Sequence, residues 1–410
     1  MEDISRRIAV FNQPRLPEMV RLKYEAMVEN PFRFYRGTNH IFYEDLAKSA
    51  AIPGSPASWI SGDLHLENFG SFKSDNRLVY FDLNDFDESI LAPVIWELYR
   101  LVTSIFVAFE SLDIDQKKAL NMARQFVKSY ARTLQIGKPN YIEPQTAKGI
   151  VCDFLMSVSQ RKQKEILAKR TILKKNKLAI LSDDPRHIEL DDDHKKDLFV
   201  HITDWLKNNG ESPYNYKVTD AVFRLAGTGS VGVKRYALLL KSLNKVGEKY
   251  LLIDMKQAVT SSLAPYEFIQ QPAWEQEAQR VVAIQQLMQN RGPALLSTTV
   301  FRGESYVIQE MQPTKDSIDF KLISKQYRDM YQVIDDMGML TASSQLRSTG
   351  RMGSCTAESL MAFGRDESWI EPLIEYAKGY ADVVMKNYLL FRDDFENGLL
   401  DPLIVLPIAG

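Results

Sequence analysis

The sequence contains little cysteine. Cys152 and Cys355 are the only two in 410 residues. Two cysteines are too few for a disulfide framework or a tetrahedral zinc site. Their scarcity fits a reducing compartment, so we expect a cytoplasmic protein.

Long apolar runs and an excess of one charge are also missing. No run of about 18 uncharged apolar residues occurs, so we expect no membrane-spanning helix. The acidic opening MEDISRRIAV is unlike a signal peptide. Lys and Arg number 51 against 53 Asp and Glu, which gives a net charge of −2 and makes a nucleic-acid partner unexpected. With 45% hydrophobic residues, the chain is expected to be globular, with room for two or three compact units.

One stretch, residues 61–96, combines carboxylates and asparagines with apolar residues typical of β-strands. It reads SGDLHLENFGSFKSDNRLVYFDLNDFDESILAPVIW. Its aromatic residues would be drawn into a core, which would bring several carboxylates together in a cleft. Two carboxylates about 4 Å apart repel by about 4 kcal/mol at an effective dielectric constant of about 20. The stretch therefore requires a cation, and Mg²⁺, which prefers oxygen ligands, is the expected one.

Helices are predicted on both sides of this stretch. Apolar residues recur at helical spacing in 17–49, 97–109 and 116–133. The basic segment 161–177 predicts a further helix, which is either a solvated face or a docking surface for an acidic, phosphate-rich partner. A polar connector follows at 181–197.

A β-meander is predicted from Tyr216 onward. A G-x-G-x-x-G pattern lies between its first two strands and comprises Gly227, Thr228, Gly229, Ser230 and Gly232. This pattern also occurs in dinucleotide-binding folds, but there a helix follows the glycines directly. Here 233–240 has the composition of a strand, which favours a hairpin whose glycine loop covers phosphates.

Residues beyond the meander complete a candidate nucleotide site. Lys256 ends the third strand and is expected to meet an anion. Glu277, on a helix predicted at 274–289, is a candidate ion-pair partner for that lysine. Strands are predicted at 298–301 and 305–310. A hinge is expected at 309–313, where the backbone of Glu310 and Met311 would contact an adenine edge. Helices dominate after Ile318.

These parts resemble the protein-kinase-like fold. GDLHLEN resembles the catalytic loop of aminoglycoside and choline phosphotransferases, which implies that Asp63 meets the substrate hydroxyl and that Asn68 holds metal. NDFDES resembles the metal-binding segment of the same superfamily and implies that Asp85 is a ligand. Asp87 is a candidate second ligand, because alternate residues of an extended segment share one side. Glu97 resembles an acid that such enzymes carry on the following helix.

The order of the parts differs from that of an ordinary kinase, because the catalytic and metal loops precede the glycine loop. We therefore expect a circularly permuted, two-lobed α+β fold. Residues 1–210 would form the first part of a helical lobe, 211–312 a β-rich nucleotide-binding lobe, and 313–410 the second helical part. Permutation is permitted where the old termini lie close together.

The arrangement over roughly residues 31–395 resembles the bacterial domain of unknown function 2252 family. Two residues depart from the kinase pattern, since Ser61 and Gln345 stand where phosphotransferases commonly carry histidine. Neither departure removes the base or a metal ligand.

The expected function is phosphoryl transfer from ATP, with Mg²⁺, to a hydroxyl of a small molecule. Two alternatives remain open at this point, a protein-modifying kinase or AMP transferase and a nucleotide-binding pseudokinase. A further interpretation is that Asp63, Asn68 and Asp85 merely cap turns and helices, as these residue types often do.

Overall fold

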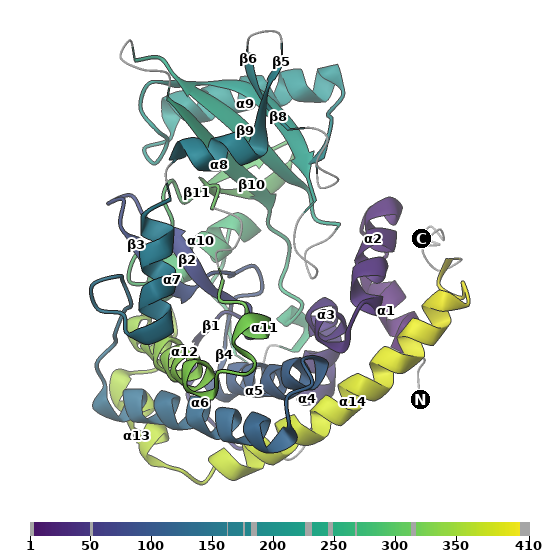
Figure 1. Cartoon of the computed structure of the whole chain (residues 1–410), viewed down its shortest axis with the longest axis vertical. Helices are drawn as coiled ribbons and strands as arrows, with labels where there is room; N and C mark the ends of the chain where they lie inside the picture. The colour runs from purple at the N-terminus through teal and green to yellow at the C-terminus, as the bar shows by residue number, and fades with distance from the viewer. Residues whose placement is uncertain are drawn as a thin grey trace.

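The apolar runs between residues 216 and 310 form most of a six-stranded antiparallel sheet (Figure 1). The computed structural model describes residues 4–49, 52–161, 163–174, 177–181, 187–225, 232–244, 249–266, 269–312 and 317–401. The strand order is β11 (Ser297–Phe301), β12 (Glu304–Glu310), β10 (Tyr250–Gln257), β9 (Arg235–Ser242), β8 (Tyr216–Arg224) and β7 (His187–Ile188). The predicted meander and the two later strands are thereby confirmed.

Register and backbone geometry place two of the predicted site residues. Lys256 on β10 lies opposite Arg235 on β9 and Val307 on β12. Gly232, just before β9, has φ +97°, and a Cβ added there would lie 2.9 Å from Cδ of Arg15. This turn therefore requires glycine. A strand, β9, follows Gly232 rather than a helix, which is consistent with the predicted hairpin. Gly227, Thr228, Gly229 and Ser230 lie outside the described residues.

Helices cover the sheet on two sides. α10 (Glu277–Met288) packs against β11 and β12. α9 (Asp192–Asn208) buries Leu198, Ile202 and Trp205 in a core shared with the sheet. The predicted division at residue 210 assigns α9 to the helical part. The apolar residues of this helix share a core with the strands.

The basic segment 161–177 is not a single helix, and that prediction needs correction. α7 (Gly149–Ser159) ends before it, α8 (Gln163–Arg170) occupies its first half, and a hairpin of β5 (Thr171–Lys174) and β6 (Lys177–Ile180) follows. β-Branched residues favour strands, and Ile180 at the end of the hairpin is buried against Val222 and Leu239 of the sheet. Burial of this apolar side chain overrides the helical pattern of the charges.

The other helices form a large second body, in which the first and last helices of the chain pack against each other (Figure 1). α5 (Val94–Ser111) is buried along most of its length, and α14 (Ile370–Glu396) packs on it. α12 (Tyr327–Arg347) likewise packs on α6 (Gln116–Ile136). The chain after residue 313 therefore returns to the N-terminal half, as predicted. The remaining elements are α1 (Ile4–Asn12), α2 (Pro17–Val28), α3 (Pro31–Gly37), α4 (Asn39–Ala47), η1 (Ala264–Tyr266), α11 (Phe320–Ile323) and α13 (Ala357–Arg365).

The stretch 61–96 and the four residues before it form two small antiparallel strand pairs between the two bodies. β1 (Ala57–Ile60) pairs with β4 (Ile90–Pro93), and β2 (Phe69–Lys73) pairs with β3 (Val79–Leu83). The loops 61–68 and 84–89 connect these strands and carry the predicted catalytic and metal-binding residues. In the part of the chain that the structure describes, every helix is too short or too polar to cross a membrane.

Candidate active site

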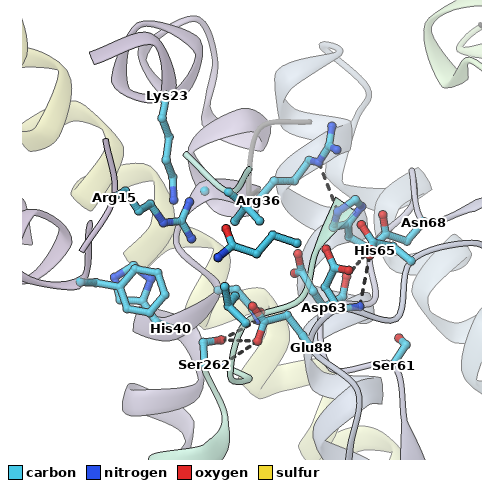
Figure 2. Close-up of a pocket in the computed structure, with 18 residues that line it drawn as sticks. Arg15, Lys23, Arg36, His40, Ser61, Asp63, His65, Asn68, Glu88 and Ser262 are labelled. Carbon is cyan, nitrogen blue, oxygen red and sulfur yellow. Dashed lines mark hydrogen bonds between the residues drawn. The ribbon is translucent and has the colours of Figure 1, made fainter. Parts of the chain in front are cut away.

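Two adjoining cavities lie between the sheet and the helical body. The first, the sheet-side cleft, encloses about 330 Å³ and is lined by Lys256, Arg235, Val281, Val307 and Met311 among others. The second, the helix-side cavity, encloses about 70 Å³. Its lining includes Phe11, Arg15, Lys23, His40, Asp63 and Glu88 (Figure 2). Both share Arg36, Asn68, Asp85 and Asp87. The loops 61–68 and 84–89 therefore stand at the junction.

Buried strands hold these two loops in register. Phe69 pairs with Leu83, and the Asn84 N–H donates to the Asn68 carbonyl at 3.1 Å. Both strands are almost wholly buried, so their ends are fixed by packing. This arrangement brings Asp85 and Asp87 beside Asn68. They lie in a loop, so the alternation expected of an extended segment does not apply to them.

Asp63 is bound by Arg100, a residue that sequence reasoning did not identify. Arg100 Nε and Nη2 donate to Asp63 Oδ1 at 3.0 and 2.8 Å. The guanidinium is fully buried and lies 3.7 Å from the centre of the Tyr35 ring. Burial raises the pKa of Asp63 to about 7, although Arg100 lowers it. The carboxyl can therefore gain or lose a proton near neutral pH.

Asn68 is held by the backbone of loop 61–68. Its Nδ2 donates to the Asp63 carbonyl at 2.6 Å, which fixes the orientation of the amide group. The side chain is buried and lines both cavities. Asn68 is thus fixed to loop 61–68 by its amide group and lies where the two cavities adjoin.

Lys256 forms ion pairs with both aspartates of loop 84–89. Its Nζ contacts Asp87 directly and lies 3.7 Å from Asp85 Oδ1. Burial raises the pKa of Asp87 to about 6, an effect that Lys256 opposes and Asp85 reinforces. The predicted meeting of Lys256 with an anion therefore occurs, but the anion is a carboxylate from the N-terminal half.

The pairing of Glu277 with Lys256 needs correction. Glu277 begins α10, where its Oε2 accepts from Arg280 Nε at 2.7 Å and its Oε1 accepts from Thr260 at 3.2 Å. Lys256 pairs with Asp85 and Asp87 instead. The α10 side chains that line the sheet-side cleft are instead Val281 and Gln285. The sequence spacing could not show which face of α10 lines the cleft, because polar residues occur on several faces of this helix.

The predicted hinge also needs correction. The Glu310 N–H donates to the Ala294 carbonyl at 2.8 Å, and the Met311 N–H donates to the Leu252 carbonyl at 2.9 Å. The Glu310 carbonyl accepts from Gln312 Nε2 at 2.8 Å. These groups are engaged because β12 remains hydrogen-bonded to its neighbours through its last residue. The Met311 side chain still lines the sheet-side cleft.

Residues able to hold a divalent metal can be tested against the preferences of Mg²⁺. Among the described residues, no three His, Cys, Asp or Glu side chains gather closely enough to hold a metal ion by themselves. Asp85, Asp87 and Asn68 offer two carboxylates and an amide, and the ammonium of Lys256 shows that the carboxylate pair accepts a cation. Mg²⁺ usually keeps waters and takes its other ligands from phosphate. The donor set therefore fits Mg²⁺ that arrives with a phosphate compound.

Further basic residues face the sheet-side cleft. Arg224 and Arg235 both bind the buried Asp254, with shortest contacts of 2.8 and 2.6 Å. These guanidinium groups hold the pKa of Asp254 well below its usual range. Arg170, from the basic segment, also lines this cleft. Part of the basic segment thus faces a cavity of the protein itself.

The two departures from the kinase pattern meet in one buried network. Glu97 Oε1 accepts from the Ser61 N–H and hydroxyl, both at 2.6 Å, and Glu97 Oε2 accepts from Gln345 Nε2 at 2.8 Å. The Tyr130 hydroxyl in turn donates to Gln345. Ser61 and Gln345 therefore anchor loop 61–68 to α5 and α12. The sequence analysis singled out Ser61, Glu97 and Gln345 but neither their contact nor the participation of Tyr130.

Two other polar residues of the stretch have structural roles. Asp82 lies on β3, where its Oδ2 is 3.7 Å from Arg347 Nη1. It lines neither of the two cavities. His65 lies 3.2 Å from Arg36 Nε and accepts from the Glu67 N–H at the same distance, while Arg36 pairs with Glu67. His65 thus positions the basic side chain of Arg36 at the junction.

Comparison with known proteins identifies a family for almost the whole chain. No curated protein and no solved structure matches it. Residues 15–394 match the family described as "Uncharacterized protein conserved in bacteria (DUF2252)". The chain belongs to this family.

Proposed function

We propose that this protein is an ATP- and Mg²⁺-dependent phosphotransferase that phosphorylates a hydroxyl of a small molecule. One observation carries the proposal. Asn68, Asp85 and Asp87 stand at the junction of two cavities, with Lys256 on one side and Asp63 on the other. A phosphoryl donor in the sheet-side cleft and an acceptor in the helix-side cavity would meet at this junction.

The arrangement of the sheet supports this proposal. A three-stranded meander with a lysine on its third strand, then a helix and two more strands, is the order of the small lobe in the protein-kinase-like fold. Here β8, β9, β10, α10, β11 and β12 follow that order. The catalytic and metal loops come from residues that precede this lobe in the sequence. We therefore propose a circularly permuted member of that fold.

The protein's own residues account for acceptor activation. Asp63 Oδ2 would accept the proton of the acceptor hydroxyl, because Arg100 occupies Oδ1. The hydroxyl oxygen forms a bond to the γ-phosphorus, the bond between that phosphorus and the β,γ-bridging oxygen breaks, and ADP leaves. A base with a pKa near the working pH is the most effective, and the pKa of Asp63, about 7, satisfies this condition.

Charge neutralisation would come from groups on both sides of the junction. Mg²⁺ held by Asn68, Asp85 and Asp87 supplies positive charge at the phosphates when bound. Lys256 would bind phosphate oxygens of the nucleotide in place of its present partners, Asp85 and Asp87, which would then be available to hold Mg²⁺. This exchange explains why a lysine in a strand faces two carboxylates.

The size of the helix-side cavity favours a small acceptor over a protein. Asp63 lines a cavity of about 70 Å³, which is too small for a peptide segment. The alternatives of a protein-modifying enzyme and of AMP transfer therefore rank lower. A pseudokinase is also less favoured, because a carboxyl with a raised pKa beside a metal-binding pair is a typical catalytic feature.

Radiolabelled ATP tests the proposal directly. Incubation of the protein with Mg²⁺, a metabolite extract and ATP labelled at the γ-phosphate should transfer label to a small molecule. Asp63→Asn should retain nucleotide binding and lose transfer, whereas Asp85→Asn should lose Mg²⁺-dependent nucleotide binding. Asp197→Asn is a matched control, because this exposed carboxylate pairs with Arg302 on the far side of the sheet.

Three outcomes would contradict parts of the proposal. Label from the α-phosphate on a protein would indicate AMP transfer. Nucleotide binding without any transfer would indicate a pseudokinase. Equal nucleotide affinity in the wild type, Asp85→Asn and Lys256→Met would exclude the proposed site.

A further inference from the structure

The helix-side cavity is lined at one end by basic residues. Arg15 lies between α1 and α2, Lys23 on α2 and His40 on α4, and all three line the cavity that also contains Asp63 (Figure 2). These residues precede the predicted catalytic loop, and sequence reasoning assigned them no role. The proposed transfer reaction uses only the other end of the cavity.

Lys23 is almost completely buried, with 1% of its surface exposed. Its Nζ donates to Asn12 Oδ1 at 3.0 Å. Burial and the neighbouring Arg15 lower the pKa of Lys23, while Glu88 and Asp63 act in the opposite direction. A buried ammonium beside a guanidinium is unfavourable unless anions are near. Glu88 supplies one negative charge to this pair of cations.

Glu88 is itself engaged by other groups. Its Oε2 accepts from the Ser262 N–H at 2.6 Å, from the Ser262 hydroxyl at 2.8 Å and from the Ser261 hydroxyl at 3.1 Å. These bonds hold the carboxylate at the wall formed by the chain that follows β10. Glu88 is therefore a fixed carboxylate in the cavity that also contains the buried Lys23 and the half-buried Arg15.

His40 gives an independent indication of a ligand. Both ring nitrogens are buried and have no hydrogen-bond partner among the residues that the structure describes, although the ring stacks on Phe11 at 3.7 Å and 6°. A buried polar group without a partner is rare and destabilising. Asn39 Oδ1, in the same wall, is also buried without a partner. A ligand bearing both an anion and a hydroxyl would satisfy these groups.

We propose that the acceptor carries an oxyanion, a phosphate or a carboxylate, which binds at Arg15, Lys23 and His40. The proposal deepens the proposed function and rests on it for the reaction. Asp63 repels an anion and accepts a hydroxyl proton, whereas the opposite end attracts an anion. The charges of the cavity therefore orient such an acceptor with its hydroxyl toward Asp63.

The volume of the cavity limits the size of this acceptor. About 70 Å³ is accessible to water, and one water requires roughly 10–15 Å³ by the same measure. The space accommodates a phosphate or carboxylate and a short hydroxylated chain. A large aminoglycoside exceeds it.

Binding of inorganic phosphate tests the anion site without knowledge of the acceptor. Titration of phosphate, and separately of acetate, into the protein saturated with a non-hydrolysable ATP analogue should show binding of one or both. Arg15→Gln and His40→Phe should weaken that binding at least about tenfold, since each loses a hydrogen bond to a charged group. Arg21→Gln is the matched control, because Arg21 lies on α2 but is exposed and pairs with Asp401.

The ring nitrogens of His40 provide a second measurement. Their nitrogen-15 chemical shifts should change when phosphate binds and should stay unchanged when only the ATP analogue binds. His40→Phe keeps the aromatic stacking on Phe11, so it should fold even if Arg15→Gln does not. Absence of phosphate and acetate binding to the wild type would overturn the inference. Equal affinity in the wild type and both variants would overturn it as well.

The inference and the proposed function can fail separately. Lys256→Met should weaken nucleotide binding and leave binding of phosphate, in the absence of nucleotide, unchanged. A wild type that binds nucleotide but neither anion contradicts only the inference. A wild type that binds phosphate at Arg15 but does not bind nucleotide contradicts the proposed function. Stronger binding of phosphate than of acetate would assign the oxyanion as a phosphate, and the reverse would assign it as a carboxylate.

Discussion

Replacement of Asp63 by asparagine should make the protein more stable than the wild type at neutral pH, and the difference should grow with pH. The pKa of Asp63 is about 7 in the folded protein against an ordinary value of 3.8. Between these values the folded state binds a proton that the unfolded state releases. The free energy of unfolding of the wild type therefore falls as the pH rises through this window, and Asp63→Asn lacks this loss.

The expected magnitude follows from the two pKa values. One pKa unit corresponds to about 1.4 kcal/mol, so the interval from 3.8 to about 7 gives about 4 kcal/mol. The Asp63 side chain is 20% exposed, and solvent screening reduces the effect to about 2–4 kcal/mol. The amide oxygen of asparagine still accepts a hydrogen bond from Arg100, so the contact itself is largely retained.

Urea unfolding of the wild type and of Asp63→Asn, measured at intervals from pH 4 to pH 8, gives this difference. Comparison at each pH cancels the titration of all the other groups. The stability advantage of the variant should increase steadily from the acidic end and level off above pH ~7. A difference that does not vary with pH would refute the assignment of Asp63 as a carboxyl whose pKa is raised by burial.

Other perturbations have equally definite outcomes. Asp254→Asn should lower the free energy of unfolding by about 3–5 kcal/mol at neutral pH, because it leaves Arg224 and Arg235 without their buried partner. The pKa of Asp254 is lowered, so this loss should shrink as the pH falls into the acid range, and urea unfolding at several pH values checks the slope. Gly232→Ala should cost about 1–3 kcal/mol in the same assay, because φ is +97° and the side chain of Arg15 is close. Gln345→Ala should lower kcat more than nucleotide affinity, because it removes a hydrogen bond that anchors loop 61–68 through Glu97. An unchanged kcat would contradict that positioning role.

The raised pKa of Asp63 links stability to the proposed chemistry. Burial destabilises the charged carboxylate, and the same burial brings its pKa to the range where a general base is effective. Arg100 limits the cost by binding one oxygen, and its own burial is supported by the Tyr35 ring. The end of the helix-side cavity that contains Asp63 is therefore less stable than a simple apolar core would be.

Local patterns in the sequence were sufficient for the secondary structure around the site. The alternation of apolar residues predicts β8, β9 and β10, the helical spacing predicts α5, α6 and α10, and both are confirmed. The loops that carry Asp63, Asn68, Asp85 and Asp87 are recognisable because polar residues interrupt apolar strands. These features depend on neighbours along the chain, which the sequence displays directly.

Contacts between distant segments were decided only by the tertiary structure. Packing placed Lys256 against Asp85 and Asp87. It placed Glu277 against Arg280, with which it forms an ion pair. It also turned 171–180 into a hairpin, because burial of Ile180 outweighs a helical pattern of charges. The sequence by itself determined which residues are polar and where the strands of the meander lie. Only the fold decided which charges face one another, since the free energy of a buried charge depends on the groups packed around it.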